Sequence, residues 1–279
     1  MPQNERGYFV RYWKGSIALS STRDYPLLRH IFQSGFITHN QLFELLKLDY
    51  CLSSRNAFNN RVLRLVRHGL LSRQERLSAS RDVVYSLSTS GALALGVNAN
   101  PQHSIAKRAS NIKNRQLHHS LDLNEIHLAL KRTGSLVYWI PEIEVRSRSD
   151  LTPYGYCKYY DAVVVVRLGG QDCKFALEYE RTPKAARHYA AIRDRIEQET
   201  TIAHFLYLVP SHDFMWFIAE KLSQCRRAVH IGLFHDFLEQ PLALPVRRSG
   251  SPAMLTLASV LSPGKEAQRS GELFAGIAV

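Results

Sequence analysis

Three carboxylates in the middle of the chain are spaced so that they could bind a divalent cation. Asp161 precedes an apolar run, residues 162–166, that is typical of a buried strand. Two glycines then turn the chain, and a second apolar run leads to Glu178 and Glu180. Because side chains alternate along a strand, both glutamates point to one face, and a hairpin places Asp161 within their reach. Hard oxygen ligands of this kind suit Mg²⁺ or Mn²⁺.

The segments around these carboxylates alternate between helical and strand-like patterns. The sequence predicts a mixed α and β (α+β) domain, in which helices flank a mixed sheet. The expected helices are 117–132, 184–199 and 213–224, and the expected strands are 136–147, 160–168, 174–180, 203–209 and 230–234. This order places Asp161 on the second strand and both glutamates on the third.

This element order resembles the PD-(D/E)XK nuclease superfamily over residues 118–235. Asp161 and Glu178 match the acidic residues of that motif, although Tyr160 stands where proline is usual. Glu180 stands where lysine is most common, and that lysine is thought to position the attacking water. In some members the lysine lies on the following helix, which is the place of Lys184.

The resemblance implies a distinct role for each of these residues. Asp161 and Glu178 would bind the metal, with Glu125 of the first helix as an extra ligand, and Glu180 or Lys184 would orient the water. The metal would lower the pKa of that water and offset charge on the scissile phosphate. Arg181 and Arg187, with Lys184, would hold DNA phosphates. The same fold also occurs as a DNA-binding or scaffolding domain that does not cut, so both alternatives stay open.

The charge of the chain is concentrated in its first part. The net charge is +12, and residues 1–110 hold 15 Lys and Arg against 6 Asp and Glu. This imbalance indicates a polyanion such as DNA as the partner, although a basic surface that serves only solubility has the same composition. The four cysteines form no Cys-x-x-Cys pair, and no apolar stretch reaches the length of a membrane span. A cytoplasmic protein without a membrane anchor is therefore expected.

Residues 23–97 show the pattern of a small DNA-binding domain. Two short helices are expected within 23–48, the second with Thr38 as its N-cap, and a third over about 55–68 after a serine cap. A hairpin with a basic tip follows at 70–87. The exposed face of the third helix and the hairpin tip would supply the DNA contacts, which are Arg55, Asn59, Asn60, Arg61, Arg64, Arg67, Arg76 and Arg81.

Residues 36–96 resemble the winged helix-turn-helix family along their whole length. The resemblance implies that the third helix enters the major groove and that the wing contacts phosphate or the minor groove. Arginine and asparagine are the residue types that bind the edges of guanine and adenine. A wing module that mediates protein contacts, with its arginines merely solvated, is the alternative.

The complete arrangement is similar to the replication-relaxation proteins of plasmids and other mobile elements, and to mobilisation accessory proteins of the protein C type. It consists of an N-terminal arm (1–22), the winged helix (23–97), a basic linker (98–116), the nuclease-like domain (117–240) and a tail (241–279). The resemblance implies binding of double-stranded DNA in support of a relaxase or replication initiator, with a homodimer as one expected state. An Mg-dependent endonuclease of a defence or mobile-element system is the alternative function, and a pure protein adaptor is a third class.

Overall fold

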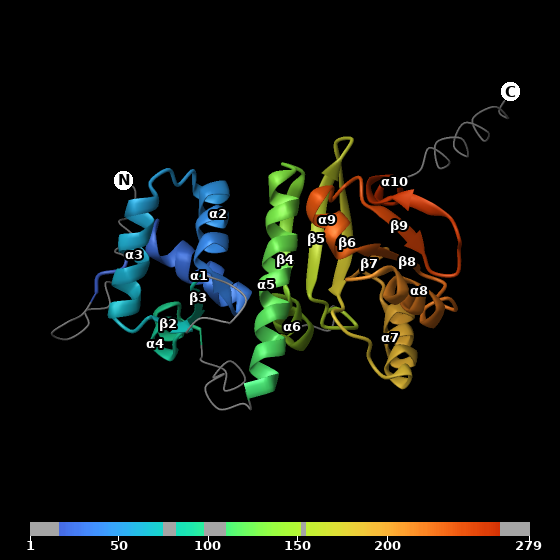
Figure 1. Cartoon of the computed structure of the whole chain (residues 1–279), viewed down its shortest axis with the longest axis horizontal. Coiled ribbons are helices and arrows are strands. Elements are labelled where there is room, and N and C mark those ends of the chain that lie inside the picture. The colour runs from blue at the N-terminus through green and yellow to red at the C-terminus, as the bar shows by residue number, and fades with distance from the viewer. Residues whose placement is uncertain (1–16, 75–81, 98–109, 152–154, 263–279) are drawn as a thin grey trace, which may run out of the picture. The chain divides into compact units, whose positions relative to one another are not determined.

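The computed structural model describes residues 17–74, 82–97, 110–151 and 155–262. The chain divides into two compact units, Met1–Asn124 and Glu125–Val279, and the boundary falls within the long helix α5 (Ser110–Arg132). The predicted fold class is confirmed, because helices flank a mixed seven-stranded sheet (Figure 1). In the described part of the chain, no helix is both long and apolar enough to cross a membrane.

The first unit combines helices with a small antiparallel sheet. Its strands lie in the order β1-β3-β2, and strand β1, which the sequence did not predict, pairs Ile37 with Tyr85 of β3. The elements are α1 (Asp24–Ser34), β1 (Ile37–Thr38), α2 (His39–Tyr50), α3 (Arg55–Arg67), β2 (Leu71–Gln74), β3 (Val84–Leu87) and α4 (Thr89–Ala94). The first part of α5 also belongs to this unit, since Asn124 donates to the carbonyl of Phe36 at 2.8 Å.

Local sequence signals explain where these helices begin and end. The Thr38 side chain accepts from the amide of Gln41 at 3.1 Å, and the Gln41 side chain accepts from the amide of Thr38, also at 3.1 Å. This reciprocal capping satisfies two amides that the first turn of α2 leaves unpaired. Gly35 ends α1 with φ of 70°, a conformation that residues with a Cβ rarely adopt. The predicted N-cap at Thr38 is confirmed.

The second unit is built around the seven-stranded sheet, in the order β10-β9-β8-β7-β6-β5-β4. Strands β4, β5 and β6 form an antiparallel meander, after which β6, β7 and β8 run parallel. The strands are β4 (Leu136–Pro141), β5 (Ala162–Leu168), β6 (Gln171–Tyr179), β7 (His204–Val209), β8 (Ala228–Leu233), β9 (Pro245–Arg248) and β10 (Met254–Thr256). The helices after α5 are α6 (Glu142–Leu151), α7 (Ala186–Gln198), α8 (His212–Lys221), α9 (Phe234–Glu239) and α10 (Leu257–Leu261).

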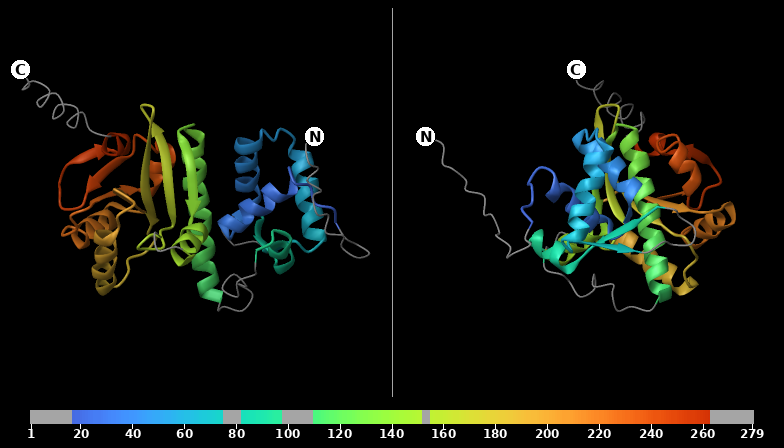
Figure 2. Two further views of the ribbon diagram at one scale, coloured as in Figure 1. Left: turned by 180° about the vertical axis from the view of Figure 1, so that it is seen from behind. Right: turned by 60° about the vertical axis from the view of Figure 1, so that its left-hand side comes forward.

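Helices α7 and α8 cover one face of this sheet (Figure 2). Tyr189 and Ile196 of α7 and Ile218 of α8 pack with Phe205 and Ile231 in one buried cluster. Helix α9 lies on the other face. The ring of Tyr179 in β6 lies 4.7 Å from the ring of Phe234, the first residue of α9. Tyr179 and Glu178 are neighbours along the strand, so their side chains point to opposite faces. The sheet therefore presents Glu178 toward the α7 side.

Three segments differ from the sequence predictions. The strand predicted over 136–147 ends at Pro141, and α6 follows, since Glu142 and Arg146 at helical spacing form an ion pair of 2.8 Å. Helix α5 begins at Ser110 rather than at 117, so it takes up the end of the predicted linker 98–116. The sheet continues past residue 240, because β9 and β10 lie within the predicted tail 241–279.

Candidate nucleic-acid interface and carboxylate cluster

Helix α3 is fixed to its unit by one apolar stripe. The Ser54 side chain accepts from the amide of Ala57 at 3.2 Å and begins the helix. Phe58, Val62 and Leu65 recur at helical spacing and are buried. The rotational setting of α3 is therefore determined by its packing, and the residues opposite the stripe must face solvent.

The outward face of α3 consists of Asn56, Asn60, Leu63 and Arg67, all of which are exposed. Each lies close to the direction opposite the buried stripe when residues advance by 100° along a helix. Asn60 and Arg67 are among the predicted DNA contacts, whereas Asn56 and Leu63, which share their exposed face, are not. The sequence itself indicates that Asn56 and Leu63 share this face, because each precedes one of the predicted contacts, Asn60 or Arg67, by four residues.

Two other residues predicted to contact DNA lie on the side of α3 that faces α2, and both interact with α2. Arg55 donates to the side chain of Asn40, and its guanidinium lies 4.4 Å from the centre of the Phe43 ring. The amide oxygen of Asn59 lies 2.9 Å from Nε2 of His39. These contacts tie α3 to α2, so Arg55 and Asn59 contribute to the packing of the unit.

Arg61 and Arg64 lie on the opposite side of α3, next to α1. The guanidinium of Arg64 donates to Oδ2 of Asp24 at 2.6 Å, and Arg61 lies 3.7 Å from Oδ1 of the same carboxylate. The Asp24 side chain is buried at 1% exposure, so it needs these partners. Arg61 and Arg64 thus form an ion-pair network with Asp24, and their predicted contact with DNA stays a prediction.

The remaining predicted DNA contacts belong to the wing and to the second unit. Arg76 and Arg81 lie outside the described residues. Arg181 and Arg187 are exposed, one just after β6 and the other at the start of α7. Their predicted contact with DNA phosphates stays a prediction.

The pairing of β5 with β6 brings Asp161 beside Glu178, as the hairpin predicted. Ala162 lies opposite Leu177, so the preceding residue, Asp161, is next to Glu178. Oδ2 of Asp161 accepts from the amide of Tyr179 at 2.7 Å. One oxygen of the predicted metal ligand is thus engaged in holding the two strand ends together.

Glu178 is paired with a lysine that the sequence prediction missed. The ammonium group of Lys158 contacts Oε1 of Glu178, and their side chains are only 11% and 7% exposed. Burial raises the pKa of Glu178 above its ordinary value, Lys158 opposes that shift, and Asp161 adds to it. Lys158 precedes Asp161 by three residues, and this short spacing was the only signal in the sequence.

Glu180 is paired with Lys184, the residue that the resemblance singled out. Lys184 donates to Oε1 of Glu180 at 2.5 Å, and the hydroxyl of Tyr189 donates to Oε2 at 2.8 Å. Burial lowers the pKa of Lys184, but the carboxylates of Glu178, Glu180 and Asp161 together outweigh it and raise that pKa. Lys184 therefore belongs to the group formed by Asp161, Glu178, Glu180 and Lys158, which we call the carboxylate cluster.

The residues of this cluster do not fit a divalent cation as they stand. Its three carboxylates already face two ammonium groups, and one oxygen of Asp161 accepts a backbone amide. Among the described residues, no three His, Cys, Asp or Glu side chains form a group that could hold a metal ion. The predicted ligand set of Asp161, Glu178 and Glu125 is therefore not assembled.

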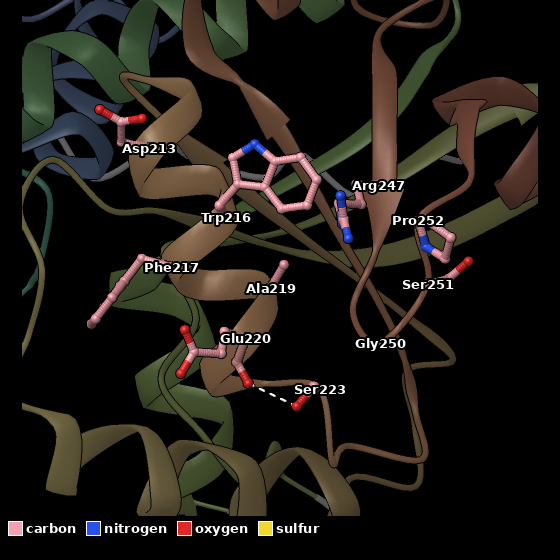
Figure 3. Close-up of a pocket in the computed structure, with 10 residues that line it drawn as sticks. All are labelled: Asp213, Trp216, Phe217, Ala219, Glu220, Ser223, Arg247, Gly250, Ser251 and Pro252. Carbon is pink, nitrogen blue, oxygen red and sulfur yellow. Dashed lines mark hydrogen bonds between the residues drawn. The ribbon is translucent and has the colours of Figure 1, made fainter.

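A surface pocket of about 630 Å³ lies elsewhere on the second unit, between α8 and β9 (Figure 3). The guanidinium of Arg247 stacks on the indole of Trp216, 3.7 Å from the ring centre. Asp213 and Glu220 add acidic groups to the rim. None of the predicted site residues lines this pocket.

The comparisons with known proteins identify the family of the chain. A family model described as replication-relaxation matches residues 28–201, which include α2, α3 and the carboxylate cluster. No curated protein and no solved structure matches the chain. Since the match covers more than half of the sequence, the chain belongs to the replication-relaxation family.

Proposed function

We propose that this protein binds double-stranded DNA as an accessory factor of plasmid or mobile-element replication or mobilisation. In this proposal the first unit is a winged helix that recognises a site through α3. The second unit is a nuclease-like domain that holds DNA or a partner without cutting. A relaxase or a replication initiator is the proposed protein partner, and a homodimer on paired half-sites is the proposed assembly.

The outward face of α3 is the observation that carries the proposal. Three helices followed by a β-hairpin form the arrangement of winged-helix proteins, in which the third helix enters the major groove. The outward face carries two asparagines and one arginine, whose side chains can make paired hydrogen bonds to adenine and guanine. The basic first part of the chain supplies attraction to the phosphate backbone.

The topology of the second unit supports a nuclease-like domain. An antiparallel meander followed by a helix and a parallel strand is the order that the PD-(D/E)XK resemblance implies, and Asp161 and Glu178 stand at matching strand ends. The lysine pairing favours the non-cutting alternative over an Mg-dependent endonuclease. A divalent ion would have to displace ammonium groups from Glu178 and Glu180, two nearly buried carboxylates.

Substitution of the outward face tests the proposal. We expect Asn60→Ala and Arg67→Ala each to weaken binding to a preferred duplex by about 1–3 kcal/mol, because a paired contact to a base edge is lost. The preferred duplex can be enriched with the wild-type protein from a pool of random sequences, and affinities can then be measured by fluorescence anisotropy.

The matched control is Arg29→Ala, which removes one exposed arginine from α1, outside the α3 face. This control is expected to bind the enriched duplex as the wild type does. The Asn60→Ala substitution should reduce the affinity for a scrambled duplex less than it reduces the affinity for the enriched duplex. Wild-type affinity of both α3 variants for the enriched duplex would show that α3 does not contact bases.

A further inference from the structure

A groove of about 550 Å³ lies beside α3 in the first unit, between that helix and the start of α1. Its charged lining residues are Arg23, Asp24, Arg61 and Arg64. Three guanidinium groups and one carboxylate leave a net charge of +2 in a concave surface. Such a surface attracts anions more strongly than scattered charges on a flat face do.

The carboxylate at the base of the groove holds two of these arginines in place. Oδ2 of Asp24 accepts from Arg64 at 2.6 Å and from the amide of Ser20 at 2.8 Å, while Arg61 lies 3.7 Å from Oδ1. A guanidinium carries five N–H donors, so one carboxylate cannot use the donors of both arginines. Arg64 also donates from Nη1 to the carbonyl of Ala18 at 3.5 Å, and the donors that then remain on the arginines are available to an anion that enters the groove.

The arginines are also crowded enough to repel one another. Burial lowers the pKa of Arg61, Asp24 opposes that shift, and Arg23 and Arg64 lower it further. Arg61 stays charged nonetheless, because a guanidinium does not lose its proton in proteins. An anion in the groove would relieve this repulsion, so the groove is better suited to a bound anion than to water alone.

We propose that this groove binds a phosphate of the DNA backbone, and that Arg23, Arg61 and Arg64 are its ligands. The proposal rests on the DNA-binding function proposed above. Asn60 lines the groove and also lies on the outward face of α3, so a phosphate in the groove would place the adjoining base before that face. Arg61 and Arg64 thereby position the duplex, and the outward face specifies its sequence.

The salt dependence of duplex binding tests this assignment. Arg23 is exposed, so Arg23→Gln is the variant least expected to disturb folding, and Arg64→Gln removes a second ligand. For each variant we expect the magnitude of the slope of log K against log salt to fall by up to about 0.9, because the phosphate in the groove loses one of its cationic ligands. The loss should be similar for enriched and scrambled duplexes, and Arg29→Gln should keep the wild-type slope.

Wild-type slopes in both Arg23→Gln and Arg64→Gln, with duplex binding retained, would overturn the groove assignment and leave the proposed function standing. If the wild-type protein binds no duplex at all, the proposed function itself is contradicted. Inorganic phosphate at constant ionic strength distinguishes a free anion from the backbone. A rise in the melting temperature of the wild type but not of Arg23→Gln, together with wild-type salt slopes in the variants, would assign the groove to a free anion and overturn the assignment to the DNA backbone.

Discussion

Lys158→Met is expected to lower the free energy of unfolding by about 3–5 kcal/mol at alkaline pH, where Glu178 is ionised, because it leaves that carboxylate buried without its cation. Both side chains of this pair are almost completely buried, at 11% and 7% exposure. Methionine fills a similar volume, so the loss of charge rather than of packing is what the variant measures. Chemical denaturation with urea provides the measurement.

Two comparisons isolate the charge effect at Lys158. Lys184→Met removes the other lysine of the carboxylate cluster, but Lys184 is 40% exposed and Glu180 keeps its bond from Tyr189. We expect that control to cost only about 1 kcal/mol. Adding Glu178→Gln to Lys158→Met should recover much of the loss. Equal costs for the two lysine variants would mean that Lys158 does not neutralise a buried charge.

His230 is expected to make the protein less stable in acid. The residue is 4% exposed, and among the described residues neither of its ring nitrogens has a hydrogen-bond partner. Burial, together with the neighbouring His204 and Arg248, lowers the pKa of His230 to about 4. The ring of His204 lies 6.0 Å away, nearly parallel to that of His230. The folded protein thus holds His230 in its neutral form.

The sign of the effect follows from the lowered pKa. Above pH 6.5 the histidine is neutral in both folded and unfolded chains, and its contribution to stability is complete. As the pH falls from 6.5 to 4, the unfolded chain takes up a proton that the folded chain does not, so the folded state loses about 3 kcal/mol. The expected result is that His230→Phe removes this part of the pH dependence.

Urea denaturation between pH 7 and 4 measures the difference between the wild type and His230→Phe. His188→Phe is the control, because it makes the same substitution at an exposed position of α7. The pH profile of the control should match that of the wild type. If His230→Phe also follows the wild-type profile, the buried histidine is not the source of the acid sensitivity.

The sequence predicted the features that rest on periodicity and local capping. The buried stripe of α3 and its serine cap follow from spacing alone, which is why the outward position of Asn60 and Arg67 could be anticipated. The neighbourhood of Asp161 and Glu178 was also predictable, because a two-glycine turn and the two-residue period of strands leave one register.

The features that were missed depend on tertiary contacts. Lys158 lies in an irregular segment before β5, where no period determines which way a side chain points. Ile143 and Val145 alternate with glutamates as in a strand, yet Glu142 and Glu144 pair with arginines four residues later in α6. The pairing of Asp24 with Arg61 and Arg64 could not be predicted from local spacing, since forty residues separate Asp24 from Arg64.

The most direct test of the account is a titration of supercoiled plasmid with the wild-type protein in Mg²⁺ or Mn²⁺, in which one gel reports both binding and cleavage. We expect the plasmid to be retarded while remaining supercoiled, because DNA binding is the proposed function and the lysines occupy the carboxylates that cleavage would require. Nicked or linear product that disappears in Asp161→Ala would contradict the non-cutting role. Plasmid that is neither retarded nor cut would contradict DNA binding itself.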